Sequence, residues 1–396
     1  SWDSQRKQFY WHRFFHHQPY LNFEEPRVME EMLDAVRFWM DLGIDGFRLD
    51  AVPYLIEAEG TNCENLPGTH KILKQLRAMV DEEYPGRILL CEANQWPDDV
   101  VEYFGNGDEC QMAFHFPVMP RLYMGLRRGS RECISEILAH TPHIPDGCQW
   151  GTFLRNHDEL TLEMVTEEDR HYMWEEYAPE SRWRCNLGIR RRLSPLVDND
   201  DAKIRLLNAM LLSLPGSPVL YYGDEIGMGD DPWLPDRDGV RTPMQWDDSE
   251  TAGFSTALPE DFHLPLIRTF GHDPEHVNVA RQMGDPSSLL VWTRAMLGIR
   301  RHHPVFGTGE FTDLGGPDMA VMSFLRHNEH ETVLCLANLS DTERTVALHL
   351  PQFAGVAGSS LIHGQDAQPV KADGTLSVPL WPYGYRWLQV SREERS

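Results

Sequence analysis

The sequence is poor in basic residues and has no long apolar run. It contains 36 Lys and Arg against 61 Asp and Glu, which gives a formal net charge of −25. Such an acidic surface repels nucleic acids and anionic membranes, so neither is an expected partner. No stretch reaches the roughly 18 consecutive apolar residues of a membrane-spanning helix. These absences exclude two classes of partner but do not identify the ligand.

Paired cysteines and a glycine-rich phosphate loop are also absent. The seven cysteines are scattered along the chain and include no Cys-x-x-Cys motif. We therefore expect neither a disulfide framework nor a zinc site, but reduced and mostly buried thiols in a cytoplasmic protein. No glycine-rich loop follows the first predicted strand, and no organic cofactor is expected.

Strands and helices alternate over the first three quarters of the chain. A helical pattern of apolar residues covers 26–40, and Gly43 ends it. The predicted strands that follow are 46–50, 87–93, 111–116, 151–156 and 218–222. Because helical patterns separate these strands, the strands should be parallel.

Five parallel strands fit either an open doubly wound sheet or the last five units of a (β/α)8 TIM barrel. Charged residues at three strand ends, together with the missing phosphate loop, favour the barrel, whose first three units would then be missing. After about residue 309, short strands alternate with turn signals. This change predicts an α/β barrel domain at 26–308, followed by an all-β sandwich domain at 309–396.

Acidic residues stand at the ends of three predicted strands. These residues are Asp50, Glu92 and Asp158, the last with His157 beside it. In a barrel such ends form the active-site face, and cleavage of a glycosidic bond needs two carboxylic acids there. Arg48 should point to the same side as Asp50, where its charge would favour an ionised nucleophile. A single acid at a strand end can also cap the next helix or bind solvent. The prediction of a catalytic site therefore depends on finding several such acids together.

Three of these motifs resemble ordered signatures of the α-amylase family of glycoside hydrolases. They are 46–51 (GFRLDA), the strand-end Glu92 and 153–158 (FLRNHD). The run 18–22 (QPYLN) is similar to a fourth signature of the family. In the family, this signature lies where the chain exits a small domain that is inserted after the third barrel strand. Residues 1–25 are therefore expected to be the end of that inserted domain. The resemblance implies these roles: Asp50 as nucleophile, Glu92 as general acid/base, Asp158 as third carboxylate, and Arg48, His157 and Arg241 as substrate-binding residues.

Later runs narrow the resemblance to the branch of the family that interconverts maltose and trehalose. These runs are 156–164, 188–193, 221–229 and 238–246. They imply an isomerase acting by retaining, intramolecular glucosyl transfer through a covalent glucosyl-enzyme. A hydrolytic α-glucosidase or a sucrose isomerase would share every catalytic residue, and a non-enzymatic relative would tend to lack the acids. We expect a disaccharide substrate and a homo-oligomer.

The resemblance also implies a calcium site. Its ligands would be the carbonyls of Tyr54 and Leu55 and the carboxylate of Glu57. However, Tyr20 stands where the family has an aspartate, and a phenol is a poor calcium ligand, which puts the metal in doubt.

Two further features of the sequence concern completeness and water. The first family signature, which lies at the third barrel strand, does not occur in this sequence. Five strands cannot close an eight-stranded barrel. We therefore expect the chain to need a missing N-terminal barrel segment. The long segments 159–199 and 224–285 are expected to form a lid that excludes water. The arginine run 190–192 is expected to be a solvated or salt-bridged loop.

Overall fold

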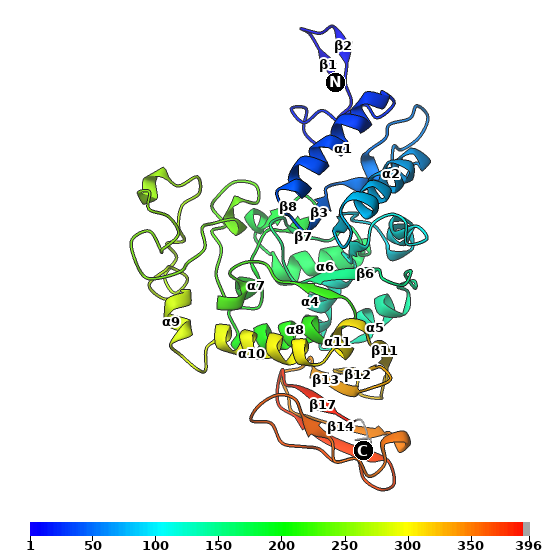
Figure 1. Cartoon of the computed structure of the whole chain (residues 1–396). Coiled ribbons are helices and arrows are strands. Elements are labelled where there is room, and N and C mark those ends of the chain that lie inside the picture. Colours follow the sequence, from blue (N-terminus) through cyan, green and yellow to red (C-terminus); the bar gives the residue numbers. More distant parts are fainter. Residues whose placement is uncertain (391–396) are drawn as a thin grey trace. The chain divides into compact units, whose positions relative to one another are not determined.

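The computed structural model describes residues 1–390 (Figure 1). The chain divides into two compact units. The first unit comprises residues 1–116 and 141–151, and the second comprises residues 117–140 and the chain from residue 152 onward. The last six residues of the predicted domain 309–396 lie outside the described residues. No helix within 1–390 combines the length and the apolar character that crossing a bilayer requires.

A parallel sheet forms the centre of the first unit. Its strands are β3 (Gly46–Leu49), β4 (Ile88–Cys91), β5 (Met112–Phe114) and the beginning of β6 (Gln149–Phe153), in the order β6-β5-β4-β3. The helices are α1 (Pro26–Asp41), α2 (Pro67–Glu83) and α3 (Pro97–Val100), with short 3-10 turns η1 (Val52–Tyr54) and η2 (Val101–Phe104). A small hairpin joins β1 (Trp2–Asp3) and β2 (Gln8–Phe9).

Local sequence explains how α1 leads into β3. Pro26 lies in the first turn of α1, where its missing N–H is not needed, and the side chain of Glu25 accepts a hydrogen bond from the backbone N–H of Arg27. Gly46 then begins β3. A Cβ atom at Gly46 would lie 2.1 Å from the carbonyl oxygen of Ile88, so only glycine allows β3 to approach β4 this closely.

Apolar residues of the sheet and of helix α2 contribute to the core of the first unit. Leu89 and Cys91 of β4 and Ala113 of β5 are fully buried, and they belong to one apolar cluster with Leu73 and Val80 of α2. Burying one large aliphatic side chain contributes roughly 1.5–3 kcal/mol. Every residue of β4 is apolar, but only Leu89 and Cys91 are buried, whereas Ile88 is exposed and Leu90 is half-buried.

The second unit contains the end of β6 and its other neighbour in the sheet, β10 (Ser217–Val219). Its helices are α4 (Val118–Arg128), α5 (Glu132–Ala139), α6 (Glu167–Tyr177), α7 (Leu193–Leu196), α8 (Asp201–Ser213), α9 (Val279–Met283), α10 (Leu289–His302) and α11 (Val305–Thr308). Its 3-10 turns are η3 (Ser181–Trp183), η4 (Asp224–Ile226), η5 (Asp238–Val240), η6 (Pro259–Asp261) and η7 (Pro351–Phe353). Helix α8 packs against α10, and Asp200 caps α8 by accepting hydrogen bonds from the backbone N–H groups of Ala202 and Lys203.

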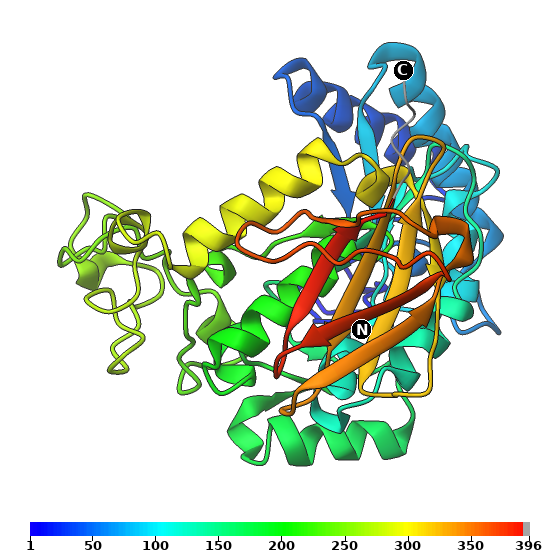
Figure 2. The same ribbon diagram turned by 90° about the horizontal axis from the view of Figure 1, so that it is seen from below.

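Two antiparallel sheets form the C-terminal part of the second unit (Figure 2). The larger sheet has the order β11 (Glu310–Asp313), β12 (Val321–His327), β13 (Thr332–Asn338), β17 (Tyr385–Gln389) and β15 (Ser359–Ser360). The smaller sheet pairs β14 (Arg344–His349) with β16 (Thr375–Leu380). Leu334 and Leu336 of the larger sheet share an apolar core with Val346 and Val378 of the smaller one. This arrangement confirms the predicted all-β region.

The predicted barrel strands are present, with shifted ends. The strand predicted at 151–156 is β6, which begins at Gln149 and ends at Phe153. No element was predicted within 159–199, but this segment contains α6 and a three-stranded sheet of β7 (Leu160–Thr161), β9 (Gly188–Ile189) and β8 (Arg184–Cys185). Strands of two residues are too short for an alternating pattern to reveal them.

Candidate active site

The register of β3 and β4 places two predicted catalytic acids next to each other. Leu49 pairs with Cys91 across the parallel strands, and Asp50 and Glu92 are the residues that follow. The pairing continues beyond the strands, because the backbone N–H of Glu92 donates to the carbonyl of Leu49 at 3.0 Å. Ala51 has a positive φ of 47° and turns the chain immediately after Asp50. The two acids therefore project from adjacent strand ends.

Arg48 contacts both of these acids. Its Nη1 atom lies 3.0 Å from Oδ1 of Asp50, and its Nη2 atom forms an ion pair with Oε2 of Glu92. The contact with Asp50 was predicted from the two-residue spacing, whereas the contact with Glu92 was not. The side chain of Asp50 is 74% exposed, but that of Glu92 is only 21% exposed. One guanidinium group thus orients an open carboxylate and a sheltered one.

The third acid, Asp158, lies in a cluster within the second unit. Its Oδ1 atom is 2.8 Å from Nη2 of Arg241, and its Oδ2 atom is 3.4 Å from Nε2 of His157. Arg241 also donates from Nε to the carbonyl of His157 at 2.7 Å. The predicted residues Asp158, His157 and Arg241 therefore form one group of contacts.

Buried groups fix the backbone that carries Asp158. The backbone N–H of Asp158 donates to the side-chain oxygen of Asn156 at 3.0 Å, which forms a tight turn. Arg155 is buried and donates from Nη2 to the carbonyl of Asp158 at 2.7 Å. Arg155 also donates from Nε to the carbonyl of Arg191 at 2.7 Å. Two residues of the motif 153–158, Arg155 and Asn156, therefore fix the backbone of Asp158.

The sequence reasoning missed Arg237. Its Nε atom lies 2.7 Å from Oε2 of Glu159 and 3.5 Å from Oδ1 of Asp158, so two arginines share that carboxylate oxygen. Arg237 lies one residue before the run 238–246 that carries part of the family resemblance. Its position beside this run was the one signal in the sequence that could have identified Arg237 as a site residue.

Tyr20 was predicted only as a departure from the family. Burial raises the pKa of its phenol, the charges of Asp50 and Tyr54 raise it further, and Arg13 opposes them. Tyr20 therefore stays protonated at neutral pH, and its phenol lies near enough to Asp50 to sense its charge.

The residues predicted to bind calcium fit that ion poorly. Glu57 is exposed, and the neutral phenol of Tyr20 supplies no negative charge. The guanidinium of Arg13 lies 4.5 Å from the ring centre of Tyr54 and pairs with Glu64, so a cation of the chain already occupies this region. Calcium prefers six to eight oxygen ligands that include carboxylates. Within residues 1–390, no group of three or more His, Cys, Asp or Glu could hold a metal ion.

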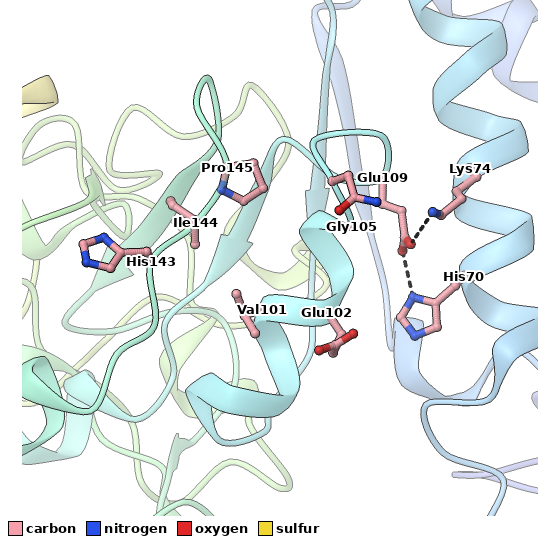
Figure 3. Close-up of a pocket in the computed structure, with 10 residues that line it drawn as sticks. His70, Lys74, Val101, Glu102, Gly105, Glu109, His143, Ile144 and Pro145 are labelled. Carbon is pink, nitrogen blue, oxygen red and sulfur yellow. Dashed lines mark hydrogen bonds and ion pairs between the residues drawn. The ribbon is translucent and has the colours of Figure 1, made fainter.

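A separate hollow of about 660 Å³ lies in the first unit and contains none of the predicted site residues (Figure 3). Two of its basic side chains pair with Glu109. Oε2 of Glu109 lies 2.9 Å from Nδ1 of His70, and Oε1 of Glu109 lies 3.9 Å from Nζ of Lys74. These pairs give the hollow a structural explanation.

Comparison with known proteins identifies the fold and the family. The α-amylase catalytic domain matches residues 1–309, and the C-terminal domain of maltogenic amylases matches residues 315–387. The crystal structure of a trehalulose synthase mutant in complex with Tris superposes with a TM-score of 0.74, at 24% identity, over 99% of this chain and 74% of that one. The fold is thus part of the α-amylase (β/α)8 barrel followed by a β-sheet domain, as predicted.

Curated relatives are much closer in sequence. A trehalose synthase of Pimelobacter sp. strain R48 is 56% identical over 99% of this chain and 70% of its own length. A trehalose synthase/amylase of Mycolicibacterium smegmatis is 59% identical over 98% of this chain and 68% of its own length. The chain therefore belongs to the α-amylase family of glycoside hydrolases and, within that family, to the trehalose synthases.

Proposed function

We propose that the protein interconverts maltose and trehalose by transferring a glucosyl unit within one bound disaccharide. The observation that carries the proposal is the pair of contacts that Arg48 makes with Asp50 and Glu92. Two carboxylates that share one guanidinium suit a retaining mechanism, in which the carboxyl groups stand only about 5–5.5 Å apart. The identity to trehalose synthases supports this reaction over others of the family.

In the first step, Asp50 attacks the anomeric carbon of the non-reducing glucose. Glu92 gives its proton to the glycosidic oxygen, the carbon–oxygen bond breaks, and glucose is released into the pocket. The glucosyl unit is now an ester of Asp50. In the second step, the anomeric hydroxyl of the retained glucose attacks the same carbon, Glu92 takes up the proton, and the ester bond breaks. Two inversions give retention at the donor carbon.

Asp158 is proposed to bind sugar hydroxyls and stabilise the transition state. Because Arg241 and Arg237 hold one of its oxygens and His157 lies near the other, the carboxylate is oriented before substrate arrives. Arg48 is proposed to orient Asp50 and Glu92 in the same way. No step of this mechanism uses a metal ion.

The demanding requirement is to exclude water while the retained glucose turns over. Water attacking the ester would give two glucose molecules and no isomer. The long segments 159–199 and 224–285 are proposed to supply the cover. The second of these has little regular structure beyond η4, η5, η6 and α9.

Incubation of the full-length protein with maltose tests the proposal. We expect trehalose to form, and we expect trehalose as substrate to yield maltose, with glucose as the minor product of both reactions. Products would be separated by chromatography. Glucose as the only product would indicate a hydrolytic α-glucosidase instead, and isomerisation of sucrose in place of maltose would indicate a sucrose isomerase.

Three other sequence predictions remain proposals. We propose the domain ranges 1–25, 26–308 and 309–396, and the ends of the two family matches, at residues 309 and 315, support the second boundary. We also propose a homo-oligomer and a cytoplasmic location.

A further inference from the structure

The arginine run 190–192, predicted to be a solvated or salt-bridged loop, ends in a buried cation of the second unit. Arg191 has the predicted ion pairing, because its Nε atom lies 3.0 Å and 2.9 Å from the two carboxylate oxygens of Asp230. The side chain of Arg192, in contrast, is fully buried. A buried charge must be compensated by partners for the hydration that it loses. The neighbours of Arg192 therefore show what this side chain stabilises.

Two consecutive tyrosines pack against the guanidinium of Arg192. This guanidinium lies 4.7 Å from the ring centre of Tyr221 and 4.7 Å from that of Tyr222, where cation–π attraction stabilises it. Its Nη1 atom also donates to the backbone carbonyl of Tyr222 at 2.6 Å. Gly223 follows with a positive φ of 87°, and a Cβ atom there would lie 2.7 Å from Sδ of Met228. Arg192 and this glycine turn together fix how the two tyrosine rings are placed.

The phenol groups of the same two tyrosines hold the backbone on both sides of Arg241. The hydroxyl of Tyr221 donates to the carbonyl of Val240 at 2.8 Å, and the hydroxyl of Tyr222 donates to the carbonyl of Thr242 at 2.6 Å. Burial raises the pKa of the Tyr221 phenol, so this hydroxyl keeps its proton and can donate it. Val240 and Thr242 are themselves buried. The chain is therefore held at the residue before Arg241 and at the residue after it.

We propose that Tyr221 and Tyr222 are positioning residues that orient Arg241 toward Asp158. The inference rests on the proposed function, in which Asp158 binds sugar hydroxyls and stabilises the transition state. Arg241 reaches Oδ1 of Asp158 at 2.8 Å only while its own backbone stays in place. Loss of one phenol releases one flanking carbonyl, so Arg241 shifts and the carboxylate loses its orientation. Because Arg237 still lies 3.5 Å from the same oxygen, the loss of orientation is partial.

The substitutions Tyr221→Phe and Tyr222→Phe test this proposal, because each removes one hydroxyl and keeps the ring beside Arg192. Tyr177→Phe is the matched control, since Tyr177 is also buried and donates to a backbone carbonyl, that of Tyr123, at 2.7 Å. The kcat and KM for conversion of maltose to trehalose by the full-length protein would be measured together with Tm. We expect kcat/KM to fall about tenfold in the first two variants, mainly through kcat, and to stay unchanged in the control. A purely structural role would lower Tm in all three variants without changing kcat/KM of the folded protein.

A double-mutant cycle tests whether the tyrosines act through Arg241. Arg241→Lys keeps the positive charge but loses the planar group that reaches both Asp158 and the carbonyl of His157. In this background, Tyr221→Phe and Tyr222→Phe should lower kcat/KM little further, because the contact that they support is already lost. An equal loss in both backgrounds, or an unchanged kcat/KM in the single variants, would overturn the role of the tyrosines, and one soluble tyrosine variant is enough to decide. A parent protein that forms no trehalose would instead overturn the proposed function.

Discussion

The Nη1 atom of Arg48 lies 3.0 Å from Oδ1 of Asp50, at the end of β3. The same guanidinium pairs with Glu92 at the end of β4. One side chain of β3 therefore orients the carboxylates at the ends of both strands. Because Leu49 and Cys91 are in register, this contact follows directly from how β3 and β4 pair. It also means that removing the charge of one acid leaves Arg48 with a partner.

The first prediction concerns the proposed nucleophile. Asp50→Asn keeps the shape of the side chain but removes its charge, so kcat should fall by several orders of magnitude while substrate binding and Tm are largely kept. Trehalose formation from maltose gives kcat, and thermal denaturation gives Tm. Asp45→Asn is the matched control, because Asp45 is exposed just before β3 and its carboxylate pairs with Arg87. Near-normal isomerisation by Asp50→Asn would assign the nucleophile to another residue.

The second prediction concerns calcium. Because Tyr20 is a neutral phenol and Arg13 lies over the ring of Tyr54, the Tm of the full-length protein should be the same in EDTA and in calcium. Tyr20→Asp adds a carboxylate ligand, so calcium should raise the Tm of this variant, since a ligand that binds only the folded state stabilises it. Tyr20→Phe is the control and should not respond to calcium. A drop in Tm when EDTA is added to the unsubstituted protein would show that the site holds calcium despite Tyr20.

Much of the candidate site could be predicted because it follows short apolar runs. The runs before Asp50 and Glu92 are strands, and acids at the ends of parallel strands face one edge of a sheet. The contact between Arg48 and Glu92 could not be predicted in the same way. It depends on the register of two strands separated by about forty residues of chain, which local patterns do not encode.

The partners of the arginine run 190–192 could not be predicted from the sequence for a different reason. Arg190 donates to backbone carbonyls, and every residue has a carbonyl, so its acceptors leave no mark in the sequence. The ion pair of Arg191 with Asp230 involves a carboxylate, but the chain has 61 acidic residues from which to choose. Which of them meet depends on how the two long segments fold.

The third prediction concerns pH. The hydrogen bond to Glu109 raises the pKa of His70 above its ordinary value of 6.5, and burial of the ring opposes this shift. A raised pKa in the folded state means that the pair stabilises the protein fully below the unfolded pKa, and that this stability is lost as pH rises through the folded value. His70→Gln should therefore lower Tm most at low pH, and the difference from the parent should shrink above neutral pH. His330→Gln is the control, because His330 is highly exposed. A Tm difference for His70→Gln that is constant over pH would contradict this origin.

The last prediction concerns the open edges of the sheet. Within residues 1–390, β3 has β4 as its only neighbour, and β10 has only β6. Large apolar side chains near β3 are exposed on and after α1: Phe38 at 59%, Trp39 at 50% and Leu42 at 64%. Parallel strands are normally covered on both faces and paired on both sides, because unpaired backbone groups and bare apolar surface are costly. The edges at β3 and β10 therefore need further strands.

We predict that residues 1–396 expressed alone will not convert maltose to trehalose. A sheet of five strands cannot close into an eight-stranded barrel, so the sugar pocket would lack the wall that the other strands supply. Adding the stretch of the Pimelobacter trehalose synthase that its match to this chain leaves uncovered should supply strands that pair with β3 and β10 and should restore activity. The measurements are solubility, monomer content by gel filtration, and trehalose formed from maltose. A soluble, monomeric and active product from residues 1–396 alone would mean that the five strands already make a complete site, and that the barrel requirement is wrong for this chain.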